Sequence, residues 1–115
     1  MSQFTVRIEL HNAQRADYDA LHAAMEERGF SRLITGDNGQ TYHLPWAEYT
    51  GAGNFTSSQI RDIARVAADS TGKQNAVLVT ESSGRAWIGL TVCVDLTRYG
   101  PQRAFHRRPI GFLIR

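Results

Sequence analysis

The sequence contains very little cysteine and no long apolar run. Its single cysteine, Cys93, cannot form a disulfide within the chain, and one thiol cannot build a cysteine metal site. No segment approaches the roughly 20 consecutive apolar residues that a membrane span requires. The N-terminal residues lead directly into an alternating pattern, without the basic stretch and apolar run of a secretory signal. We therefore expect a cytoplasmic protein without a membrane partner.

The motifs that would fix a reaction class are also missing. The sequence has no metal-ligand spacing, no glycine-rich phosphate loop and no nucleophile elbow. These absences disfavour nucleotide-dependent enzymes, zinc enzymes and classical serine or cysteine hydrolases. We expect no cofactor and no metal.

The 115 residues have the composition of one globular domain, with 42% hydrophobic and 21% charged residues. The formal net charge of +2 is unevenly distributed. Residues 1–90 carry eight Lys or Arg and ten Asp or Glu, whereas residues 91–115 carry five Arg and one acid. Such an arm can follow a phosphate backbone, with Arg103, Arg107 and Arg108 as candidate nucleic-acid contacts. A solvated terminus kept soluble by arginines is an equally good interpretation.

Two different hydrophobic periods follow each other at the start of the chain. Residues 4–10 alternate strictly between apolar and polar side chains, which predicts a strand with one covered face. Residues 13–28 change to helical spacing, and Asn12 is the expected N-cap. Gly29 suits the left-handed position that ends a helix, and Phe30 would then contact the last turn in a Schellman motif.

A hairpin is expected next. Residues 32–35 and 41–49 have the composition of strands, and residues 36–39, Gly-Asp-Asn-Gly, tolerate the positive φ angles that a hairpin turn needs. Pro45 cannot donate to a ladder, so we expect a bulge or a strand end there.

The second half of the core predicts one helix and two strands. Thr56 and Gln59 have the spacing of a capping box, and Gly72 is placed to close the helix that follows. Residues 75–81 predict a fourth strand, and residues 85–94 predict a fifth.

This order of elements predicts an α+β fold with a ferredoxin-like βαββαβ core. The core would occupy residues 1–90, and a basic C-terminal strand or arm would occupy residues 91–115. Two helices would cover one face of the antiparallel sheet and leave the other face open. Because an open face has to be covered, we expect a homodimer in which the extra strand pairs across the two subunits.

Histidine and arginine are the residues left for chemistry. Imidazole and guanidinium groups suffice for metal-independent RNA cleavage, because a base activates the 2′-hydroxyl, an acid protonates the leaving oxygen and arginine stabilises the phosphorane. His22 and His11 are the candidate acid and base, and Arg7 and Arg32 are candidate phosphate contacts. Each has an ordinary interpretation as well: His22 as a half-buried residue at the core edge, His11 as a turn residue, and the arginines in surface ion pairs.

Three large aromatic side chains, Trp46, Tyr49 and Trp87, are candidates for stacking on bases. In a domain of this size such rings are more often core or dimer contacts, and this interpretation is preferred.

Short strings spread over residues 3–90 resemble one known family. The strings are Phe4-Thr5-Val6-Arg7-Ile8-Glu9-Leu10, the helix from Asp17-Tyr18 through Met25-Glu26 to Gly29-Phe30-Ser31, Gly36-Asp37-Asn38-Gly39, Thr41-Tyr42-His43-Leu44-Pro45, Val77-Leu78-Val79-Thr80-Glu81-Ser82 and Trp87-Ile88-Gly89-Leu90. They look like the GhoS antitoxins of type V toxin-antitoxin systems. The resemblance implies a ferredoxin-like fold related to small CRISPR-adaptation nuclease subunits, and a sequence-selective endoribonuclease that cleaves the messenger of a membrane toxin.

Three functions remain open at this point. The first is an antitoxin-like, metal-independent endoribonuclease that acts on mRNA as a homodimer. The second is a non-catalytic nucleic-acid-binding dimer, such as a plasmid or phage regulator, that holds RNA or DNA without cleaving it. The third is a dimerisation module whose open face binds another protein.

Overall fold

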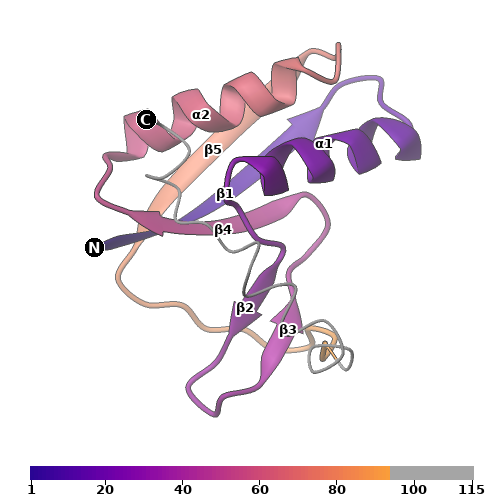
Figure 1. Ribbon diagram of the computed structural model, residues 1–115. Helices are drawn as coiled ribbons and strands as arrows, with labels where there is room; N and C mark the ends of the chain where they lie inside the picture. Colours follow the sequence, from indigo (N-terminus) through magenta and orange to yellow (C-terminus); the bar gives the residue numbers. More distant parts are fainter. Residues whose placement is uncertain (94–115) are drawn as a thin grey trace.

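The computed structural model describes residues 1–93 of the chain (Figure 1). The elements follow the order β1 (Ser2–Leu10), α1 (Arg15–Glu27), β2 (Leu33–Thr35), β3 (Thr41–His43), β4 (Glu48–Gly53), α2 (Ser57–Asp69) and β5 (Asn75–Ser82). The fold is mixed α+β, as the sequence predicts. Neither helix in this part of the chain has the length and apolar character that crossing a membrane takes.

β1 is the central strand of a three-stranded antiparallel sheet with the order β4-β1-β5. Val6 lies opposite Tyr49 of β4 and opposite Val79 of β5, which fixes the register on both sides. Both helices pack over one face of this sheet (Figure 1). The buried core contains Phe4, Val6, Ile8, Leu10, Leu21, Met25, Phe30, Tyr49, Ile60, Ala64, Ala67 and Ala68. All four apolar side chains of the predicted first strand belong to it, so the predicted alternation is confirmed.

The N-terminus of α1 differs from the prediction. The N-cap is Gln14, whose backbone N–H donates to Asp17 Oδ2 at 2.8 Å. Asn12 has a φ of 53°, in the left-handed region that asparagine tolerates. It therefore turns the chain before the helix and does not cap it.

The C-terminus of α1 is the predicted Schellman motif. Gly29 has a φ of 91°, its N–H donates to Glu26 O at 3.0 Å, and the N–H of Phe30 donates to Met25 O at 3.1 Å. Phe30 and Met25 are both buried in the core. The motif thus ends the helix and anchors the start of the next segment in one step.

The predicted hairpin forms, but its second strand is divided in two. Residues 36–39 make the turn between β2 and β3, and Gly39 has a φ of 82°. The ladder stops before Pro45, and Ala47 has a φ of 63°, so the chain turns before it resumes as β4. The strand end expected at Pro45 is confirmed, whereas one continuous strand over residues 41–49 was wrong.

α2 begins with the predicted capping box. Thr56 Oγ1 accepts from the Gln59 N–H at 3.1 Å, and Gln59 Oε1 accepts from the Thr56 N–H at 2.9 Å. The two side chains thereby satisfy two N–H groups that the first helical turn leaves free.

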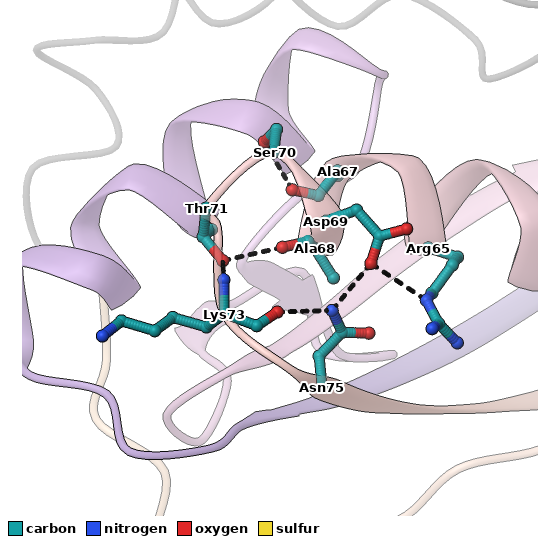
Figure 2. Close-up of polar contacts among 8 residues, drawn as sticks. All are labelled: Arg65, Ala67, Ala68, Asp69, Ser70, Thr71, Lys73 and Asn75. Atoms are coloured by element: carbon teal, nitrogen blue, oxygen red, sulfur yellow. Dashed lines mark hydrogen bonds and ion pairs between the residues drawn. The ribbon is translucent and has the colours of Figure 1, made fainter.

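Polar contacts connect the end of α2 to the start of β5 (Figure 2). Asn75 Nδ2 donates to Asp69 Oδ1 at 2.9 Å and to Lys73 O at 3.0 Å, and Arg65 Nε donates to the same carboxylate oxygen at 3.0 Å. The hydrogen bond from Asn75, followed by that from Arg65, lowers the pKa of Asp69. The connection is therefore fixed by side chains as well as by the sheet.

Residues 83–93 run to the hairpin and not along the sheet (Figure 1). An isolated bridge joins Tyr42 to Val92. Two backbone bonds flank this bridge, from His43 N–H to Thr91 O at 2.8 Å and from Cys93 N–H to Thr41 O at 2.9 Å. The strand predicted over residues 85–94 is therefore wrong for its described part, which pairs within its own subunit. Val94 and the rest of the basic arm, with Arg103, Arg107 and Arg108, lie outside the described residues.

Candidate functional site

The candidate site is built around His22, on the face of α1 that meets β4. His22 Nδ1 lies 2.7 Å from the hydroxyl oxygen of Tyr49. The histidine is 7% exposed, and Tyr49 is fully buried. Tyr18 and Met25 lie four residues before and three residues after His22, so all three share one stripe of the helix. His22 is thus a buried residue at the edge of the core.

Both members of this hydrogen bond are neutral near pH 7. Burial, followed by the nearby charge of Arg32, lowers the pKa of His22 to about 4, and burial raises the pKa of Tyr49. Within residues 1–93 the Tyr49 hydroxyl has no other hydrogen-bond partner, so we assign it as the donor to Nδ1. The imidazole proton then resides on Nε2, which is buried without a nitrogen or oxygen partner in the described chain.

Trp46 covers the imidazole and keeps half of its own surface in solvent. The two rings are nearly perpendicular, with an interplanar angle of 85° and centroids 4.9 Å apart. Trp46 is 50% exposed. Its position follows from the divided strand, because Pro45 ends the ladder and Ala47 turns the backbone on either side of it.

Two guanidinium groups flank the indole. Cζ of Arg15 lies 5.8 Å from the Trp46 ring centroid, and Cζ of Arg32 lies 5.7 Å from it, both within cation–π range. Arg15 is the first residue of α1, and Arg32 immediately precedes β2. No ion pair with a carboxylate engages either arginine within residues 1–93. We call Arg15, Arg32 and Trp46 the Trp46 surface.

Among the residues that the structure describes, the other predicted site residues lie apart from this surface. His11 is exposed, and its Nε2 lies 3.4 Å from Glu9 Oε1. His11 contacts Glu9, whereas His22 contacts Tyr49 and Trp46, so the two histidines have different partners. Arg7 points away from the core, on the sheet face that the helices leave open. Of the predicted site residues within 1–93, the structure therefore brings only Arg32 and His22 together, both beside Trp46.

Sequence reasoning did not select Arg15 and preferred a core or dimer role for Trp46. A proline that ends a strand was the available signal, since the residue after it leaves the ladder and its side chain is free to project. Nothing in the local sequence of Arg15 indicates that it meets a residue so far along the chain. The preferred core interpretation fits Tyr49, and Trp87 packs against Tyr42 with centroids 5.6 Å apart.

A pocket of about 540 Å³ lies apart from the Trp46 surface, where the hairpin meets the start of β1 and the end of β5. Its lining includes Arg85, Asp37 and Trp87. Arg85 is held there by Gln3 and by Thr5, whose Oγ1 lies 3.4 Å from Arg85 Nη1. No buried side-chain polar atom of this lining lacks a partner within residues 1–93.

No protein-family model matches the chain, and the search of curated proteins gives no significant match. The geometry of the site therefore has to carry the functional argument. In the described part of the chain, no three His, Cys, Asp or Glu side chains lie close enough together to hold a metal ion. The site provides an aromatic ring, two cations and a buried neutral imidazole.

Proposed function

We propose that the protein binds single-stranded RNA, with the Trp46 surface as its main contact. The observation that carries this proposal is the half-exposed indole with guanidinium groups 5.7 and 5.8 Å from its centre. An exposed ring stacks on an unpaired base, and adjacent arginines contact the flanking phosphates. The bases of a duplex already stack on one another, so the arrangement favours single strands.

The choice of RNA rests on the resemblance to the antitoxin family, and further cations support nucleic acid in general. On the open sheet face Arg7 lies opposite Glu48, so Arg85 is the further cation that this face contributes. The arginines of residues 91–115 extend the basic character of the chain. A cytoplasmic homodimer remains part of this proposal.

The finer description of the fold is also a proposal. We infer a ferredoxin-like sheet in which the segment before β2 lies beside β4. Its support is the pairing of Ser31 with Thr50, whose N–H groups each donate to the other residue's carbonyl oxygen at 2.8 and 2.7 Å. In this arrangement β3 and β4 are the two parts of one interrupted strand of the βαββαβ order.

Binding is favoured over cleavage by the surroundings of the histidines. A general base needs an accessible nitrogen within hydrogen-bond reach of the substrate. His22 is buried with Nδ1 engaged by Tyr49, and its pKa of about 4 makes it a weak base. His11 stands elsewhere beside Glu9. Cleavage by these two residues as an acid and base pair would require a rearrangement of the site.

The test is binding of fluorescently labelled RNA by the full chain, measured by anisotropy in EDTA. We expect single-stranded RNA to bind more tightly than duplex RNA, and Trp46→Ala to weaken the single-strand complex by about 1–3 kcal/mol. The matched control is Trp87→Ala, which removes the second indole and should leave affinity nearly unchanged. Equal affinity of wild type and Trp46→Ala, with both folded by circular dichroism, would refute the proposal.

The same protein preparations also test whether RNA is cleaved and whether RNA is preferred over DNA. Mapping of new 5′ ends after incubation with a cellular RNA pool detects an endoribonuclease. Single-stranded DNA of the same sequence distinguishes general single-strand binding from RNA binding, because only RNA carries the 2′-hydroxyl. Intact RNA together with loss of binding in Trp46→Ala is the outcome that we expect.

A further inference from the structure

The outer edge of β5 is a row of backbone groups without backbone partners in the described chain. The strand spans eight residues and pairs with β1 on one side only. No backbone hydrogen bond within residues 1–93 reaches its other side. Exposed edges usually carry proline, lysine or a bulge that prevents pairing with another chain, and β5 has no proline or lysine. Its one charged residue, Glu81, stands next to the end of the strand.

The ladder shows which residues direct their backbone groups outward. The N–H of His11 donates to Gln74 O at 2.8 Å, and the N–H of Ile8 donates to Ala47 O at 3.2 Å. Since hydrogen-bonded and non-hydrogen-bonded pairs alternate along antiparallel strands, odd-numbered residues of β1 bond to even-numbered residues of β5. The remaining β5 residues present their N–H and C=O groups to the outside, namely Asn75, Val77, Val79 and Glu81.

We propose that this edge pairs with the same edge of a second copy of the chain, in antiparallel orientation about a two-fold axis at Leu78. In this register Val77 lies opposite Val79 of the partner subunit, and Asn75 lies opposite Glu81 of the partner subunit. Each of the four residues with outward backbone groups thus lies opposite another of the four. With the axis at a neighbouring residue, at least one of them would lie opposite a residue outside this set. No like charges meet along the edge.

Leu78 supplies the side-chain contact at the axis. It is 63% exposed, and it lies on the open face of the sheet, where Arg7 is its cross-strand neighbour. The pair at the axis is of the non-hydrogen-bonded type, in which opposing side chains approach most closely. Two exposed leucines therefore bury each other when the edges join.

The dimer is small and independent of the Trp46 surface. A contact limited to two strands buries less area than a stable dimer interface, so it dissociates on dilution. Trp46 adjoins β4, the strand on the far side of β1 from β5. Dimerisation and RNA binding can therefore be lost independently of each other. One variant can be monomeric and still bind RNA, and another can be dimeric and fail to bind it.

The test is the concentration dependence of sedimentation for the full chain. Leu78→Lys places two like charges opposite each other at the axis, and we expect it to weaken dimerisation by about tenfold or more. The matched control is Thr80→Lys, which adds the same exposed charge to the same face but lies opposite Ala76 of the partner subunit. Thr80→Lys should dimerise nearly as well as wild type.

A mixture of Leu78→Lys with Leu78→Glu should restore the dimer, because opposite charges then meet at the axis. Amide exchange gives a second readout: protection of Val77 and Val79 should rise with protein concentration, while that of Leu78 should not. The proposal fails if wild type is monomeric at every concentration, or if Leu78→Lys dimerises as well as Thr80→Lys. It fails equally if Val77 and Val79 are protected independently of concentration, which would place another segment of the same chain on the edge.

Discussion

The hydroxyl of Tyr49 and Nδ1 of His22 form a 2.7 Å hydrogen bond inside the core, between the centre of a helix and a strand of the sheet. Neither partner is charged near pH 7, because burial lowers the pKa of His22 and raises that of Tyr49. The bond positions the imidazole against the indole of Trp46. A buried pair thus supports the exposed ring of the proposed RNA contact.

The first prediction concerns the pH dependence of stability. In the unfolded chain His22 binds a proton below its ordinary pKa of 6.5, whereas in the folded protein it does so only below about 4. Between these values the unfolded state holds more protons, so the free energy of unfolding rises with pH. The full effect of this one group is about 3 kcal/mol. Urea unfolding at a series of pH values between 4 and 7 measures it.

The control for this prediction removes the pair as a unit. His22→Leu combined with Tyr49→Phe leaves no unpaired polar partner behind, and its stability should depend on pH less steeply by the amount due to His22. Parallel curves for wild type and the double variant would show that His22 is not the group that titrates.

The second prediction concerns salt. Each arginine that neutralises a phosphate releases a counterion, so the logarithm of the RNA affinity falls with the logarithm of the salt concentration. Arg15→Gln and Arg32→Gln should each make this slope shallower by about 0.7, the value for one phosphate on a single strand. Arg61→Gln removes an exposed arginine that pairs with Asp62 and should leave the slope as it is. Slopes that do not differ among the three variants would exclude Arg15 and Arg32 as phosphate contacts.

The sequence was sufficient to predict those features that depend on interactions between neighbouring residues. The alternation over residues 4–10, the capping box of Thr56 with Gln59 and the glycine that ends α1 each depend on neighbours within a few residues, and all three are observed. The N-cap at Asn12 was wrong because two capping candidates compete within three residues. Gln14 prevails because Asp17 lies at the right distance to accept its N–H.

The candidate site was harder to predict because it joins distant segments. The Trp46 surface draws Arg15 from the start of a helix, Arg32 from the approach to the hairpin and Trp46 from a strand break. No periodicity within one segment encodes such a meeting. The same holds for the segment after β5, where the sequence predicted a strand but the pairing partner is the hairpin of the same subunit.

The third prediction tests the Schellman motif at the C-terminus of α1, which the sequence predicts. Gly29 has a φ of 91°, where a side chain is disfavoured, so Gly29→Ala should lower the free energy of unfolding by about 1–2 kcal/mol. Gly84→Ala is the matched control, because a Cβ at Gly84 meets nothing within 4 Å and its φ lies outside the left-handed range. Chemical unfolding of both variants decides the matter, and equal stabilities would contradict the role assigned to the Schellman motif.

The fourth prediction concerns the effect of the Trp46 ring on the pKa of His22. Desolvation is the largest cause of the low pKa of His22, and the Trp46 ring is part of what excludes water from it. Trp46→Ala should therefore move this pKa upward from about 4 toward the ordinary 6.5, and Trp87→Ala should not. An NMR titration of the imidazole follows the change directly. Arg32→Gln should raise the same pKa by a smaller amount, because the guanidinium charge is the second cause. If Trp46→Ala leaves the titration of His22 unchanged, helix and strand alone exclude water, and the indole is free to move away when RNA binds.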